Sequence, residues 1–166
     1  GKDAAPPKEK EAPPPKPKTT ADLADTIRPS LVKISQIGRD GTDGIGSGFI
    51  VSADGLIATN LHVIGEARRL QIEMHDGKTY DVTEVHGTDA HHDLALLKVE
   101  AMNLKPLPLG DSSKVRQGEN VVAMGAPEGL AFSIVQGVLS ATREIDGNEM
   151  LQVAIPIEKG NSGGPL

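Results

Sequence analysis

The sequence predicts an all-β fold in two antiparallel halves, organised as a double barrel or a sandwich. Short apolar runs bounded by turn residues recur along the chain, Asp-Gly pairs separate several of them, and no long helical pattern intervenes. Aromatic residues make up 2% of the 166 residues, against 37% for all hydrophobic residues. We therefore expect Val, Ile, Leu and Ala, rather than aromatic rings, to fill the core.

The N-terminal segment, residues 1–19, is predicted to be a disordered Pro/Lys-rich linker. It begins GKDAAPPKEKEAPPPKPK and has almost no large apolar side chains, so folding would not repay its ordering entropy. Its PxxP pattern at Pro14–Pro17 also allows interpretation as a peptide ligand, but a stiff tether is favoured.

Residues 20–108 are predicted to form a short helix followed by a small antiparallel barrel. Thr19 lies three residues before Asp22, which is a helix-start signal, and Pro29 ends the helix. The expected strands are Leu31–Ile37, Ser47–Ser52, Leu56–Asn60, Leu70–Met74, Tyr80–Val85 and Leu94–Val99.

Residues 109–166 are predicted to form a second, partial barrel. The Pro- and Gly-containing segment Leu104–Ser113 interrupts the strand pattern and marks the boundary between the halves. The expected strands are Val121–Met124, Ser133–Thr142 and Met150–Pro156, with a turn at Asp146-Gly147.

Composition excludes several classes of function. A formal net charge of −6 and the scarcity of aromatic residues argue against nucleic acid as a partner. With no Cys, the chain has no disulfide, no thiolate nucleophile and no Cys zinc site. No apolar run has the length of a membrane span. We expect no cofactor.

Three residues in the order His62, Asp93, Ser162 suggest nucleophilic catalysis. Ser162 lies in the string Gly160-Asn161-Ser162-Gly163-Gly164, whose glycines allow a hydroxyl and two backbone N–H groups to converge on one carbonyl. A serine hydroxyl needs a base, and the base needs a carboxylate to orient it. His62 follows one apolar run and Asp93 precedes another, so both are expected at a barrel mouth.

The local strings around these residues resemble the HtrA (Deg) family of trypsin-like serine proteases. The similar blocks are Gly46–Val51, Ala58–Ile64, Asp93–Lys98 and Gly160–Leu166, with Gly125–Leu130 and Val135–Ala141 in the second half. The resemblance covers essentially everything after the linker. It implies two perpendicular six-stranded β-barrels of the chymotrypsin type and a serine endopeptidase that acts on unfolded or misfolded polypeptides in protein quality control.

The resemblance also assigns roles. His62, Asp93 and Ser162 would be the catalytic triad, and Gly160, Asn161 and Ser162 would form the oxyanion hole. Ile157 would line the S1 pocket and favour small or medium aliphatic residues at P1. Polypeptide substrates, a homotrimer, and export to the bacterial periplasm or cell envelope are implied as well. Two departures flank the site: Leu61 before the histidine, and Glu158-Lys159 before the oxyanion turn.

Other interpretations compete with the protease. His91, His92 and Asp93, with His75 and His86 nearby, are possible zinc ligands, but alternation along a strand would direct adjacent side chains apart. The glycines around Ser47 lack the spacing of a nucleotide loop. The serious alternative is a protease-fold chaperone that holds unfolded chains without cutting them.

The sequence stops at Leu166, four residues after Ser162. Because a chymotrypsin-like second barrel needs further strands, we expect a fragment truncated just after the catalytic serine and inactive by itself. The loop from Glu158 to Gly164 would then be disordered or non-productive, while the His62 and Asp93 barrel would be complete.

Overall fold

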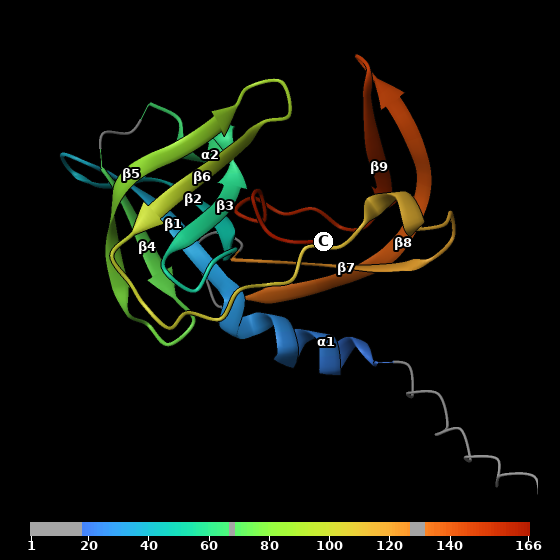
Figure 1. Ribbon diagram of the computed structural model, residues 1–166, viewed down its shortest axis with the longest axis horizontal. Coiled ribbons are helices and arrows are strands. Elements are labelled where there is room, and N and C mark those ends of the chain that lie inside the picture. Colours follow the sequence, from blue (N-terminus) through green and yellow to red (C-terminus); the bar gives the residue numbers. More distant parts are fainter. Residues whose placement is uncertain (1–17, 67–68, 127–131) are drawn as a thin grey trace, which may run out of the picture.

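The structure is a computed structural model that describes residues 18–66, 69–126 and 132–166 (Figure 1). These residues form a closed six-stranded barrel beside an open three-stranded sheet. The predicted linker and part of the Gly125–Leu130 block lie outside the described residues. No helix within the described ranges is long and apolar enough to cross a membrane.

A short helix, α1 (Thr20–Ile27), precedes the barrel. The Thr19 hydroxyl accepts a hydrogen bond from the Asp22 backbone N–H, and the Asp22 carboxylate accepts one from the Thr19 N–H, both at 3.1 Å. This reciprocal capping box fixes the start of the helix. Thr19, predicted as the last linker residue, is therefore the helix N-cap. The helix passes into the 3-10 turn η1 (Arg28–Ser30), where Pro29 prevents its continuation.

The barrel closes in the strand order β1-β2-β3-β6-β5-β4, and every pair is antiparallel. Its strands are β1 (Leu31–Gly38), β2 (Gly41–Ile50), β3 (Leu56–Asn60), β4 (Leu70–Met74), β5 (Thr79–Asp89) and β6 (Leu94–Val99). In β4 and β6 every second side chain points inward, as the pleat of a strand requires.

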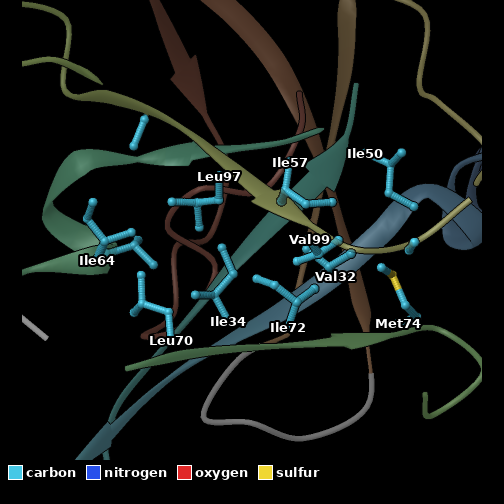
Figure 2. Close-up of a cluster of buried hydrophobic side chains, with 13 residues drawn as sticks. Val32, Ile34, Ile50, Ile57, Ile64, Leu70, Ile72, Met74, Leu97 and Val99 are labelled. Atoms are coloured by element: carbon cyan, nitrogen blue, oxygen red, sulfur yellow. The ribbon is translucent and has the colours of Figure 1, made fainter. Parts of the chain in front are cut away.

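Aliphatic side chains fill the barrel interior (Figure 2). Val32 and Ile34 from β1 meet Ile72 from β4 and Leu97 from β6, and all four are fully buried. No ring occupies the centre of this cluster, as the composition predicted.

The second half is an open sheet in the order β7-β8-β9, formed by β7 (Asn120–Gly125), β8 (Ser133–Ile145) and β9 (Asn148–Ala154). Met124 and Leu139 are the only buried large apolar residues on these three strands. The Asp146-Gly147 turn joins β8 to β9, and both residues have positive φ, as a type I′ hairpin turn requires. The predicted all-β class, with an incomplete second half and a short N-terminal helix, is confirmed.

Several strand bounds differ from the sequence prediction, and one element was not predicted. β8 continues to Ile145 rather than Thr142, and β9 spans Asn148–Ala154 rather than Met150–Pro156. β2 begins at Gly41 rather than Ser47, and β5 continues to Asp89 rather than ending at Val85. A one-turn helix, α2 (Leu61–Ile64), follows β3 directly and was not predicted. Glycines at the start of β2 and exposed polar residues at the end of β5 hide the alternation that marks a strand.

Candidate active site

His62 lies on α2, immediately after β3. Two bonds hold this turn against the start of β6: the Leu61 N–H donates to the Asp93 carbonyl at 3.0 Å, and the Asn60 side-chain amide donates to the same oxygen at 2.9 Å. Since β3 and β6 are adjacent strands of the barrel, the sheet itself brings His62 and Asp93 together.

The His62 and Asp93 side chains form a direct pair. Nδ1 of His62 lies 2.5 Å from one Asp93 carboxylate oxygen, and the His62 backbone N–H donates to the other at 2.9 Å. Asp93 has φ of +55°, a left-handed conformation that Asp tolerates better than most residues. The imidazole is thus held through both its ring and its backbone, and the tautomer with a proton on Nδ1 leaves Nε2 free to act as a base.

The Asp93 carboxylate is stabilised as an anion. Partial burial acts to raise its pKa, but hydrogen bonds from the His62 ring and backbone outweigh burial and hold the pKa of Asp93 below its usual range. Asp93 is therefore ionised at neutral pH, the state that orients an imidazole and stabilises its protonated form.

Ser162 lies on a tight turn between the barrel and the open sheet. Asn161 N–H donates to the Glu158 carbonyl at 3.2 Å, and Gly164 N–H donates to the Asn161 carbonyl at 3.0 Å. Gly163 has φ of +87°, and a Cβ added there would lie 2.1 Å from the Ser47 carbonyl oxygen. Only glycine fits this position. These bonds and the positive φ of Gly163 define the path of the loop against the barrel.

The three predicted triad residues are not all joined by hydrogen bonds. Among the described residues, the Ser162 hydroxyl has no hydrogen bond to His62. The backbone N–H groups of Gly160 and Ser162 likewise find no acceptor within the described part of the chain. Unpaired N–H groups flanking a serine are what an oxyanion hole requires, and catalytic hydrogen bonds often form fully only with substrate bound.

The remaining predicted site residues lie beside this turn. Ile157 is 76% exposed, and its assignment to an S1 pocket stays a prediction. The Asn161 side-chain oxygen is buried without a hydrogen-bond partner among the described residues. Glu158 and Lys159 are exposed on the approach to the turn.

His91 and His92 lie in the turn between β5 and β6, so the argument that a strand directs them apart is wrong. Their rings meet edge-on at 5.1 Å, and both contact Asn148 of the β8–β9 hairpin, at 2.6 Å and 2.8 Å. Nδ1 of His92 also lies 2.6 Å from Asp89. Within the described ranges no group of three His, Cys, Asp or Glu residues is arranged to hold a metal.

Sequence reasoning missed one residue at this site, Ser47 of β2. It is 1% exposed and bonds to the Ser162 turn through both its backbone and its hydroxyl. The sequence signal for it is the pair of glycines on either side, Gly46 and Gly48, which allow a close backbone approach.

Comparison with known proteins assigns the family. The model of the trypsin-like peptidase domain matches residues 46–166, which include the second half of β2, all of β3 to β9, the His62–Asp93 pair and the Ser162 turn. The chain belongs to the trypsin-like peptidase domain family. The family resemblance inferred from the signature blocks is confirmed.

The similar proteins include serine proteases named HTRA2 and DegP-like, so the domain is of the HtrA type. The chain is 39% identical over 161 residues to the mitochondrial serine protease HTRA2 of Bos taurus, covering 88% of this chain and 35% of that protein. It is 42% identical over 126 residues to a probable periplasmic DegP-like serine endoprotease of Marinomonas, covering 74% of this chain and 27% of that protein. The chain therefore spans about a third of the length of these relatives.

The fold is also similar to that of a solved serine endoprotease structure. The crystal structure of the serine endoprotease from Yersinia pestis matches with a TM-score of 0.79 and 33% identity, over 89% of this chain and 53% of that one. The peptidase-domain fold thus extends over almost all of the chain.

Proposed function

We propose that the protein containing this chain is a serine endopeptidase of the HtrA type. The observation that carries the proposal is the His62–Asp93 pair, joined by ring and backbone hydrogen bonds at the barrel mouth. The Ser162 turn, whose Gly160 and Ser162 N–H groups have no acceptor among the described residues, is bonded to the same barrel. A preorganised base and a serine within such a turn, both held by one barrel, are the groups that acyl transfer requires.

In this mechanism Nε2 of His62 removes the proton from the Ser162 hydroxyl as its oxygen attacks the scissile carbonyl. Asp93, ionised at neutral pH, stabilises the imidazolium that results. The N–H groups of Gly160 and Ser162 receive the developing oxyanion. His62 then protonates the leaving amine, and water hydrolyses the acyl-enzyme by the same steps in reverse.

The substrates proposed are unfolded or misfolded polypeptides, with small or medium aliphatic P1 residues chosen by a pocket that Ile157 lines. The periplasmic naming of the DegP-like relatives supports export to the periplasm or cell envelope, although a mitochondrial relative shows that compartments vary within the family. A homotrimer is the proposed assembly.

The experiment compares the full-length protein with its Ser162→Ala variant on unfolded casein, with products identified by mass spectrometry. We expect loss of proteolysis by a factor on the order of 10⁴ or more, with the fold retained. A fluorophosphonate should label Ser162, and EDTA should leave cleavage intact. Binding of casein without any cleavage by the parent protein would instead favour the chaperone alternative.

A further inference from the structure

Ser47 is the one residue of β2 that bonds to the Ser162 turn through both its main chain and its side chain. Its hydroxyl donates to the Gly160 carbonyl at 2.6 Å and accepts from the Ala126 N–H at 2.8 Å. Its own N–H donates to the Ser162 carbonyl at 2.8 Å. Its carbonyl accepts from the Thr59 hydroxyl at 2.7 Å. All its polar groups are thereby paired, at a position that is 1% exposed.

These contacts bear directly on the oxyanion hole. Each peptide unit is planar, so fixing a carbonyl also fixes the N–H of the next residue. Ser47 fixes two units, Gly160–Asn161 and Ser162–Gly163. They flank the Asn161–Ser162 unit, whose N–H is one of the two oxyanion donors and whose carbonyl accepts from Gly164. The direction of the Ser162 N–H therefore depends on both bonds from Ser47.

The side chain at this position must donate and accept at once. The Gly160 carbonyl needs a donor and the Ala126 N–H needs an acceptor, and one hydroxyl meets both needs. Space is restricted, because a Cβ added at Gly125 would lie 3.0 Å from the Ser47 hydroxyl oxygen and 2.7 Å from the Asn161 side-chain oxygen. A small hydroxyl side chain is thus the form that fits.

We infer that Ser47 is a positioning residue for catalysis, which sets the oxyanion hole by holding the Gly160 and Ser162 carbonyls to the first barrel. It acts through the turn and does not touch the reacting atoms. The inference rests on the proposed function, since it concerns transition-state stabilisation by the same site.

Steady-state kinetics on the full-length protein tests this inference. In Ser47→Ala we expect kcat to fall by about 10- to 100-fold with KM changed less than twofold, because a displaced donor affects the transition state more than the bound substrate. Affinity for a peptide boronate, which forms a tetrahedral adduct on the serine, should fall by a similar factor. A purely structural role would not separate kcat from KM in this way.

Two further variants control for stability. Ser35→Ala removes the hydroxyl of a buried β1 serine in the same barrel, one with no side-chain bond to the turn among the described residues, and should leave kcat unchanged. Ser47→Cys keeps the shape with a weaker donor, so a smaller fall in kcat is expected even if Ser47→Ala does not fold.

The inference is overturned if both folded Ser47 variants keep kcat within threefold of the parent, or if Ser35→Ala loses as much as they do. Ser162→Ala is run alongside to separate the two proposals. If Ser162→Ala still cleaves casein, the proposed function fails. If it is inactive while the Ser47 variants match the parent, only the Ser47 inference fails.

Discussion

The six-stranded barrel and the three-stranded sheet differ in how each buries its own apolar residues. The barrel closes on itself and encloses a cluster of 13 buried side chains, whereas the sheet buries little beyond Met124 and Leu139. The sheet leaves Val138, Ile145 and Met150 exposed. The predicted base and its carboxylate belong to the self-sufficient half. The predicted nucleophile belongs to the half that depends on neighbours, and it is held in place by bonds from β2.

The largest effect is expected from a substitution of Asp93, which tests whether this carboxylate orients the His62 imidazole. Asp93→Asn keeps a residue that tolerates φ of +55°, so the turn should survive while the carboxylate charge is lost. We expect kcat to fall by about 10⁴, since the amide favours the wrong imidazole tautomer. Kinetics on casein-derived peptides measures this, and an Asn variant retaining a tenth of the parent rate would contradict the pairing.

A matched pair of leucines tests the difference in packing. Leu97→Ala removes a fully buried side chain from the barrel and should lower the free energy of unfolding by about 3 kcal/mol. Leu151→Ala, at a half-buried position on β9, should cost about 1 kcal/mol. Urea denaturation gives both values. Equal losses would mean that the sheet is as well packed as the barrel.

The contact between the halves is tested at Gly163. Gly163→Ala places a methyl group 2.1 Å from the Ser47 carbonyl oxygen, so the turn must move away from the barrel. We expect kcat/KM to fall by about 100-fold, the scale of a displacement near 1 Å. Gly147→Ala is the control, because its φ of +80° carries the same backbone strain with no neighbour within 4 Å. It should leave kcat/KM within twofold.

The smallest effect concerns the contact of His91 and His92 with Asn148. Hydrogen bonds to Asp89 and then to Asn148 raise the pKa of His92 above its usual range. A raised pKa stabilises the folded state fully below about pH 6.5, and this contribution is lost as pH rises through the folded-state value. The urea midpoint should therefore decline slightly between pH 6 and pH 8.5.

His92→Gln should reduce that decline, while His75→Gln, at an exposed turn position, should not. A parent protein whose midpoint rises over the same interval would show that the contact is not stabilised by the charged imidazole.

Strands with regular alternation were predictable from the sequence to the residue. β3, β4 and β6 begin and end where expected, because apolar and polar positions alternate between clear turn residues. The start of β2 was not predictable, since glycines from Gly41 onward give no side-chain pattern. α2 was missed because four residues are too few to show a helical period.

The candidate site also has a part that local sequence patterns predicted and a part that they did not. The partners His62 and Asp93 were predicted from local strings, and the structure pairs them directly. The glycines around Ser47 signal a close approach at that position, but its partners were not predictable, because its bonds reach residues about 80 and 113 positions away, a separation that no local pattern encodes. The contact of His91 and His92 with Asn148 was missed for the same reason.

The division of the site has a consequence for the order of events during synthesis. A chain growing from its N-terminus completes all six barrel strands at Val99, whereas Ser162 lies in the turn after β9. At about 5–20 residues per second, the intervening stretch of roughly 60 residues takes about 3–12 s to make. The imidazole and its carboxylate can therefore assemble on the ribosome before the hydroxyl exists. On the proposed function, a nascent chain that has folded only its first barrel lacks the nucleophile and cannot yet cut its neighbours.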